Sequence, residues 1–115
     1  MEEEFREVKD RLFKIAEKLR KKGVGNEVYF TMFINDAESA IKFAEVCNPK
    51  YLEKYCEVES DAWSLLRDIK EAKEEKKISL EEHAEAYNTI VGMWKATKGL
   101  ITNKLKEKCM CKWRD

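Results

Sequence analysis

The segment VYFTMFI (residues 28–34) decides the fold, because its secondary structure is the ambiguous one in the chain. Its β-branched and aromatic residues have the composition of a strand, whereas residues 35–47, which follow it, have a helical pattern. A strand at 28–34 would need a partner, and no other segment offers one, so it would have to pair with a second copy of itself. We therefore predict one helix over residues 27–47, with an intermolecular strand as the alternative.

Three further segments carry apolar residues at helical spacing with charged residues between them. Ser79 and Glu82 match a capping box, which starts the last of these helices. The predicted helices cover residues 3–22, 27–47, 49–76 and 80–110. Because short links place consecutive helices antiparallel, the sequence predicts a single all-α domain over residues 1–115. Its architecture would be an antiparallel four-helix bundle with two short and two long helices.

The composition favours helices. Charged residues make up 40% of the 115 residues, whereas glycine occurs four times and proline once. Abundant Glu and Lys without any Gln is also typical of thermophilic proteins. The net charge of zero argues against a molecule that binds nucleic acid or membranes through its overall charge. Because we find no secretory signal pattern and no apolar run near the ~20 residues of a membrane span, we expect a cytoplasmic protein without a membrane partner.

Four cysteines fall where the predicted bundle would bring them to one end: Cys47, Cys56, Cys109 and Cys111. Free thiols, disulfides that tether the C-terminal tail, and a structural zinc site are the three interpretations. Disulfides are rare inside cells except in hyperthermophiles, and the spacing lacks the C-x2-C pair of a strong zinc site, so no metal is expected. We expect the tail KCMCKWRD (residues 108–115) to pack against the ends of the second and third helices, with Cys109 or Cys111 close to Cys47 or Cys56.

Basic residues concentrate at the two ends of the chain. Residues 9–22 hold seven basic and two acidic side chains, and residues 95–115 hold seven and two again. Because the first and last helices are neighbours in the bundle, their basic residues could form a stripe that binds phosphate groups. That stripe would consist of Arg11, Lys14, Lys18, Lys95, Lys98 and Lys104. The simpler interpretation is that these charges occupy solvated faces.

The second helix would be apolar on more than one face, and the last two helices would extend beyond the first two. Both features favour a homodimer, because a large exposed apolar patch is unusual in a soluble monomer. The candidate dimer face consists of Tyr29, Phe30, Phe33 and Ile34. The simplest interpretation of the large aromatic residues of the helices is that they belong to the core: Phe30, Phe33, Tyr55, Trp63, Tyr87 and Trp94.

We find no catalytic motif in the sequence, and therefore expect no enzymatic activity and no cofactor. The single histidine, His83, follows Glu81 and Glu82 in a charged first helical turn, which is typical of a solvated residue. The leading hypothesis is a non-enzymatic all-α interaction or scaffold protein that acts as a homodimer. The alternative is a nucleic-acid-binding accessory or regulatory protein that uses the basic stripe. A weaker alternative is a metal- or redox-responsive protein that uses the four cysteines.

Overall fold

The computed structural model describes residues 2–25 and 27–109, without the side chain of Glu27. These residues form the predicted all-α four-helix bundle, which measures 55 × 24 × 17 Å. The helices are α1 (Glu2–Lys21), α2 (Glu27–Glu45), α3 (Tyr51–Glu74) and α4 (Leu80–Lys108). Two shorter helices of 20 and 19 residues precede two longer ones of 24 and 29, as predicted. Each predicted helix end lies within two residues of the observed one.

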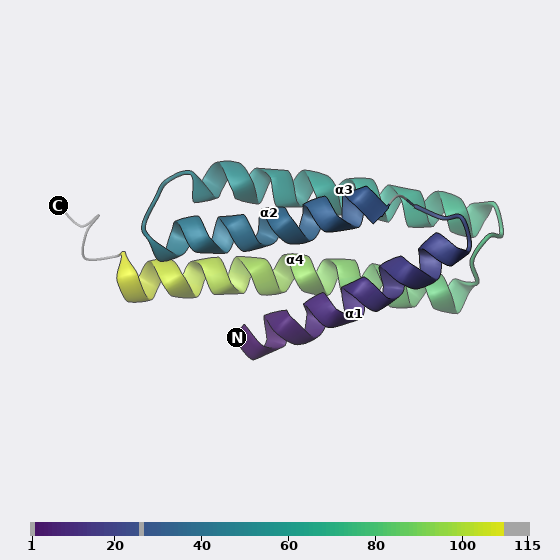
Figure 1. Cartoon of the computed structure of the whole chain (residues 1–115), viewed down its shortest axis with the longest axis horizontal. Coiled ribbons are helices and arrows are strands. Elements are labelled where there is room, and N and C mark those ends of the chain that lie inside the picture. The colour runs from purple at the N-terminus through teal and green to yellow at the C-terminus, as the bar shows by residue number, and fades with distance from the viewer. Residues whose placement is uncertain (1, 26, 110–115) are drawn as a thin grey trace.

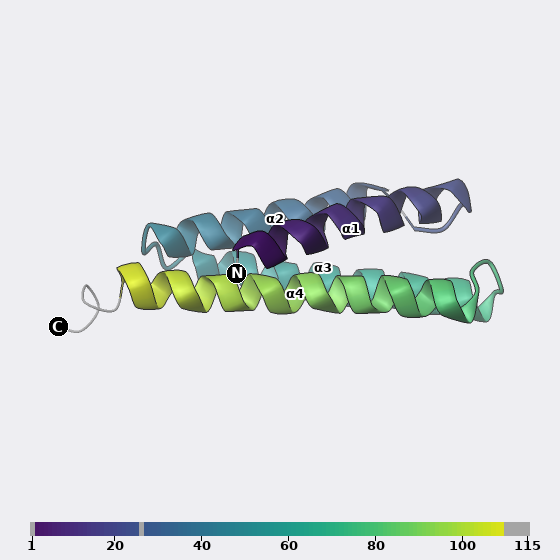
Figure 2. The same ribbon diagram turned by 90° about the horizontal axis from the view of Figure 1, so that it is seen from below.

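Consecutive helices run antiparallel in two layers, with α1 and α2 in one layer and α3 and α4 in the other (Figures 1 and 2). Helix α2 contacts all three other helices, whereas α1 and α3 lie diagonally and do not touch. Helix α4 runs almost the full length of the molecule (Figure 1). Within the described part of the chain, no helix has the length and apolar character needed to cross a membrane.

The ambiguous segment at residues 28–34 is helical and forms the first turns of α2. Phe30, Phe33, Ile34 and Ala37 follow one another at spacings of three, one and three residues, and all four are buried. This spacing places them on one face of a helix, which packs into the core of the same chain. The helix prediction is confirmed here, because core packing overrides the weak strand preference of these residues.

The links between helices depend on local hydrogen bonds. Gly23 and Gly25 have φ values of 71° and 74°, a conformation that glycine adopts without a steric penalty, and between them Val24 is buried. The predicted capping box of α4 is present: the Glu82 amide donates to Ser79 Oγ (3.1 Å), and the Ser79 amide donates to Glu82 Oε1 (2.9 Å).

A disulfide between Cys47 and Cys109 joins the end of α2 to the end of α4. The two Cα atoms lie 5.5 Å apart, and Cys109 is fully buried. This pair is one of those expected, and it closes the end of the bundle opposite the α3–α4 link. Cys56 is an exposed free thiol, and Cys111 lies outside the described residues, as does the rest of the predicted tail contact.

We predict that reducing this disulfide lowers the free energy of unfolding by about 4 kcal/mol, because the bond closes a loop with a sequence separation of 62 residues. Urea denaturation with and without reductant measures the effect. The double variant Cys47→Ala/Cys109→Ala should match the reduced protein and no longer respond to reductant. Cys56→Ser is the control and should behave like the parent. Equal urea midpoints of the parent in both conditions would contradict the prediction.

Candidate binding groove

Two aromatic side chains that we expected in the core are exposed instead: Trp63 on α3 (63%) and Tyr87 on α4 (46%). The prediction of core positions is wrong for both. Ala62, Leu65 and Ile69 fill the core side of α3, and Trp63 therefore lies on its outer surface. Large aromatic rings are among the side chains that gain most from burial, so two exposed rings on neighbouring helices mark a candidate binding surface.

Trp63 is held from one side. Its ring packs edge-on against Trp94 of α4, with ring centroids 5.7 Å apart and an interplanar angle of 76°. Trp94 is itself fixed, because its Nε1 donates a hydrogen bond of 3.0 Å to Tyr55 Oη on α3. Trp94 and Tyr55 are only partly buried, but both pack against core residues, as predicted. The contact with Trp94 therefore restricts the motion of the Trp63 ring, while part of that ring stays exposed.

His83 and Tyr87 form the other wall of the same surface. They lie one turn apart on α4 and stack, with ring centroids 6.1 Å apart and an interplanar angle of 29°. His83 is half-buried rather than fully solvated, which corrects the sequence-based expectation. Burial, and secondarily the charge of Lys73, lower the pKa of His83 below its usual value. Its imidazole is therefore uncharged at neutral pH.

These rings border a hollow of about 370 Å³ between α3 and α4, which we call the α3–α4 groove. Three cations of α3, Arg67, Lys70 and Lys73, line it, and no carboxylate does. None of the three cations forms an ion pair with a residue that the structure describes. The groove is lined by Trp63, Leu66, Arg67, Lys70, Lys73, His83 and Tyr87. It therefore offers both aromatic surface and unneutralised positive charge to a ligand.

The predicted basic stripe lies elsewhere and is interrupted. Arg11, Lys14, Lys95 and Lys98 are exposed, whereas the other two members form ion pairs. Lys18 lies 3.8 Å from Glu85, and Lys104 lies 2.8 Å from Glu2 and 3.7 Å from Glu45. The hydrogen bond and charge of Glu2 raise the pKa of Lys104. Because Glu2, Glu45 and Glu85 lie beside residues of the stripe, its surface is less uniformly positive than the sequence suggested. Binding of nucleic acid by the stripe stays a prediction.

The residues predicted as a dimer face do not share one exposed surface. Phe30, Phe33 and Ile34 are buried in the core of their own chain, and only Tyr29 is exposed. The reason is that Phe30, Phe33 and Ile34 share the face of α2 that packs into the core, whereas Tyr29 lies outside that face. The apolar side chains that remain exposed near this part of α2 are Phe13, Val28, Tyr29 and Met32. Dimerisation itself stays a prediction, as does a redox role for the cysteines.

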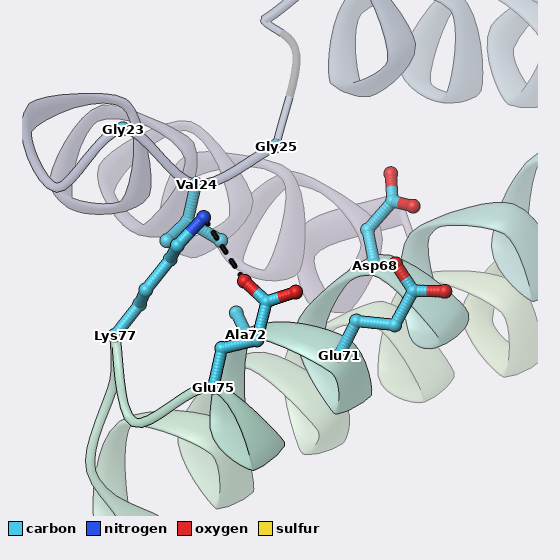
Figure 3. Close-up of a pocket in the computed structure, with 8 residues that line it drawn as sticks. All are labelled: Gly23, Val24, Gly25, Asp68, Glu71, Ala72, Glu75 and Lys77. Carbon is cyan, nitrogen blue, oxygen red and sulfur yellow. Dashed lines mark ion pairs between the residues drawn. The ribbon is translucent and has the colours of Figure 1, made fainter.

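A second hollow, of about 280 Å³, lies where the α1–α2 link approaches the end of α3 (Figure 3). Asp68, Glu71 and Glu75 line it, and Lys77 pairs with Glu75 at 3.1 Å. Within residues 2–25 and 27–109, no group of three or more His, Cys, Asp or Glu side chains is arranged to hold a metal ion. The arrangement of these carboxylates therefore gives no reason to propose a ligand for this hollow.

Asp36 of α2 and Asp61 of α3 form a carboxyl pair between the two helices. Burial, together with the hydrogen bond and negative charge of Asp36, raises the pKa of Asp61 to about 7. One oxygen of Asp61, Oδ2, is buried without a hydrogen-bond partner among the described residues. Asp61 therefore keeps its proton in the folded protein up to a higher pH than in the unfolded chain. Because of this difference, the pair destabilises the fold as the pH rises.

We predict that Asp61→Asn raises the free energy of unfolding by about 1–2 kcal/mol at pH 8 and leaves it nearly unchanged at pH 4. The ordinary pKa of this carboxyl is 3.8, so the parent should lose stability between about pH 4 and pH 7, whereas the variant should not. Urea denaturation across this pH range measures both. Glu53→Gln, an exposed site on the same helix, is the control. A gain that is the same at pH 4 and pH 8 would refute the shared-proton explanation.

Comparison of the chain with protein-family models, with curated protein sequences and with solved structures finds no match. These comparisons therefore assign no ligand to the α3–α4 groove.

Proposed function

We propose that this is a non-enzymatic binding protein that takes an anionic partner in the α3–α4 groove. The observation that carries the proposal is the exposed ring of Trp63 beside three unpaired cations, in a surface whose lining has no carboxylate. Trp, Tyr and Arg are the residues that most often dominate binding energy at interfaces, and the groove contains all three.

The energetics of the groove favour binding. Burying a large apolar side chain stabilises by about 1.5–3 kcal/mol, and Trp63 gains only part of this from its contact with Trp94. A partner that covers the ring would supply the rest. Unpaired cations on a protein of zero net charge add a local positive potential, which would attract an anion and exclude other cations.

The chemistry of the groove favours binding over catalysis. A general base or nucleophile is normally oriented by a neighbouring hydrogen-bonding group. The lining contains no Asp, Glu, Ser, Thr or Cys, and His83 is stacked on Tyr87 without a carboxylate partner in that lining. The proposed role is therefore recognition of a partner.

We expect the groove cations to control the binding of a generic polyanion, heparin. The variant Arg67→Gln/Lys70→Gln/Lys73→Gln should bind heparin at least about tenfold more weakly at low salt, because three contacts of about 0.5 kcal/mol are lost. The matched control Arg11→Gln/Lys14→Gln/Lys95→Gln removes three exposed charges of the basic stripe and should bind nearly as well as the parent. Isothermal titration calorimetry measures both. Loss in the control alone would favour the stripe, and absence of binding by the parent would refute the proposal.

Dimerisation is a second proposal, and a separate surface favours it. Phe13 of α1 and Thr31 and Phe30 of α2 border a hollow of about 220 Å³, and Phe13, Val28, Tyr29 and Met32 leave apolar surface exposed on these two helices. Exposed apolar surface of this kind often marks an interface. A second copy of the chain is the proposed occupant, so the groove on α3 and α4 would remain free in the dimer.

We predict a mass of twice the 13.6 kDa of the chain in light scattering at high protein concentration. Met32→Glu places a charge in the exposed apolar surface and should shift the population to the monomer without lowering the urea midpoint, because the side chain is exposed. Leu52→Glu, an exposed site on α3, is the control. A constant mass of 13.6 kDa across a hundredfold concentration range would refute the dimer.

A further inference from the structure

We propose that the occupant of the α3–α4 groove is single-stranded nucleic acid, with bases stacked on Trp63 and Tyr87 and phosphates on Arg67, Lys70 and Lys73. The inference rests on the proposed function and adds the class of ligand. Proteins that bind single strands without sequence preference combine a positively charged groove with aromatic side chains that stack on the bases. The α3–α4 groove contains both parts.

The arrangement of side chains along α3 suits a strand that runs parallel to the helix. Trp63, Arg67 and Lys70 are spaced by four and three residues and therefore form one row on the helix surface. At 1.5 Å per residue, the three cations span about 9 Å along the helix axis, and Trp63 lies about 6 Å before the first of them. Tyr87 and His83 line the groove from the α4 side. A nucleic-acid backbone that runs along the three cations would place its bases toward Trp63 and Tyr87.

The exposed rings favour a single strand over a duplex. In a duplex the bases are paired and stacked on one another, so their faces are not accessible to a side chain at the surface of a helix. A duplex would therefore use the cations of the groove and leave Trp63 and Tyr87 without a stacking partner. Since every base has an aromatic face, a single strand can use the rings and the cations together, irrespective of sequence.

The same rings favour nucleic acid over an acidic peptide. Carboxylates would pair with Arg67, Lys70 and Lys73, but an acidic segment has no planar ring to cover Trp63. The support of Trp63 by Trp94 also suits stacking, because a ring that is already fixed loses little conformational freedom when a base packs on it. The uncharged His83, stacked on Tyr87, extends the ring surface without adding charge.

The test uses a fluorescein-labelled oligothymidylate of twelve nucleotides, the duplex of the same length, and the intact protein. Fluorescence anisotropy from 50 to 200 mM salt should give tighter binding of the single strand. Its logarithmic salt slope should be about −2, because three phosphate contacts contribute about −0.7 each. Lys70→Gln should reduce this slope by about 0.7 and weaken the binding of all sequences equally.

Substitution of the ring separates stacking from charge. Trp63→Ala should weaken single-strand binding by about 5- to 150-fold, the loss expected for one stacked base, without changing the salt slope. Trp63→Phe should recover much of the affinity. Tyr29→Ala, which removes an exposed aromatic ring from the opposite layer of the bundle, should have no effect. Urea denaturation of each variant verifies that the fold is retained.

The outcomes distinguish this inference from the proposed function. Equal affinity for the duplex, or an unchanged affinity of Trp63→Ala, would overturn the single-strand inference while heparin binding in the groove would still support the proposed function. Binding of a polyglutamate peptide with higher affinity than oligothymidylate would identify an acidic protein segment as the partner and also overturn it. Failure of all three polyanions to bind would refute both proposals.

Discussion

The burial of α2 is the constraint on which the rest of the structure depends. Phe33, Ala37, Ala40 and Ala44 are completely buried, and α2, like α4, contacts all three other helices. Its alanines leave room for the neighbouring helices to approach closely, and Ala40 and Ala44 pack with Ile101 of α4. Phe33, a larger side chain, fills the core further along the same face of α2. Because α2 packs against both α3 and α4, its buried face helps to set the positions of the two helices.

This arrangement also explains the groove. The core sides of α3 and α4 are occupied by aliphatic side chains such as Leu65, Ile69 and Ile90. The larger rings of Trp63 and Tyr87 have no position there and lie on the outer face of the two helices. An exposed tryptophan contributes less to stability than a buried one, and the exposure of Trp63 is the observation on which the binding proposal rests.

The sequence predicted the helices well because apolar spacing and capping are local signals. The helix at 28–34 could be inferred by elimination, since no second segment could pair with a strand, and Ser79 and Glu82 identified the start of α4. The predicted helix lengths placed Cys47 and Cys109 at the same end of the bundle. They did not specify which cysteines pair, because a disulfide depends on distances between helices.

The groove could not be predicted in the same way. Trp63 lies between the core residues Ala62 and Leu66, and only the rotation of α3 about its axis decides which of these neighbours faces outward. The ion pairs that interrupt the basic stripe could not be predicted from the sequence either. Lys104 pairs with Glu2, 102 positions earlier in the sequence, because of the way α1 and α4 are aligned. Such pairings depend on tertiary structure, which the helical spacing of charges does not specify.

Among the residues that the structure describes, no ion pair involves Arg67, Lys70 or Lys73, although the protein has zero net charge. Ion pairs join α1 to its two neighbours: Lys9 pairs with Glu38 of α2, and Lys18 and Lys22 pair with Glu85 and Glu82 at the start of α4. The acidic first turn of α1 lies toward the other end of the bundle, where Glu2 pairs with Lys104 of α4, and it forms no pair with these three cations. The helix that carries the exposed Trp63 therefore also carries three cations without an ion pair to any described residue.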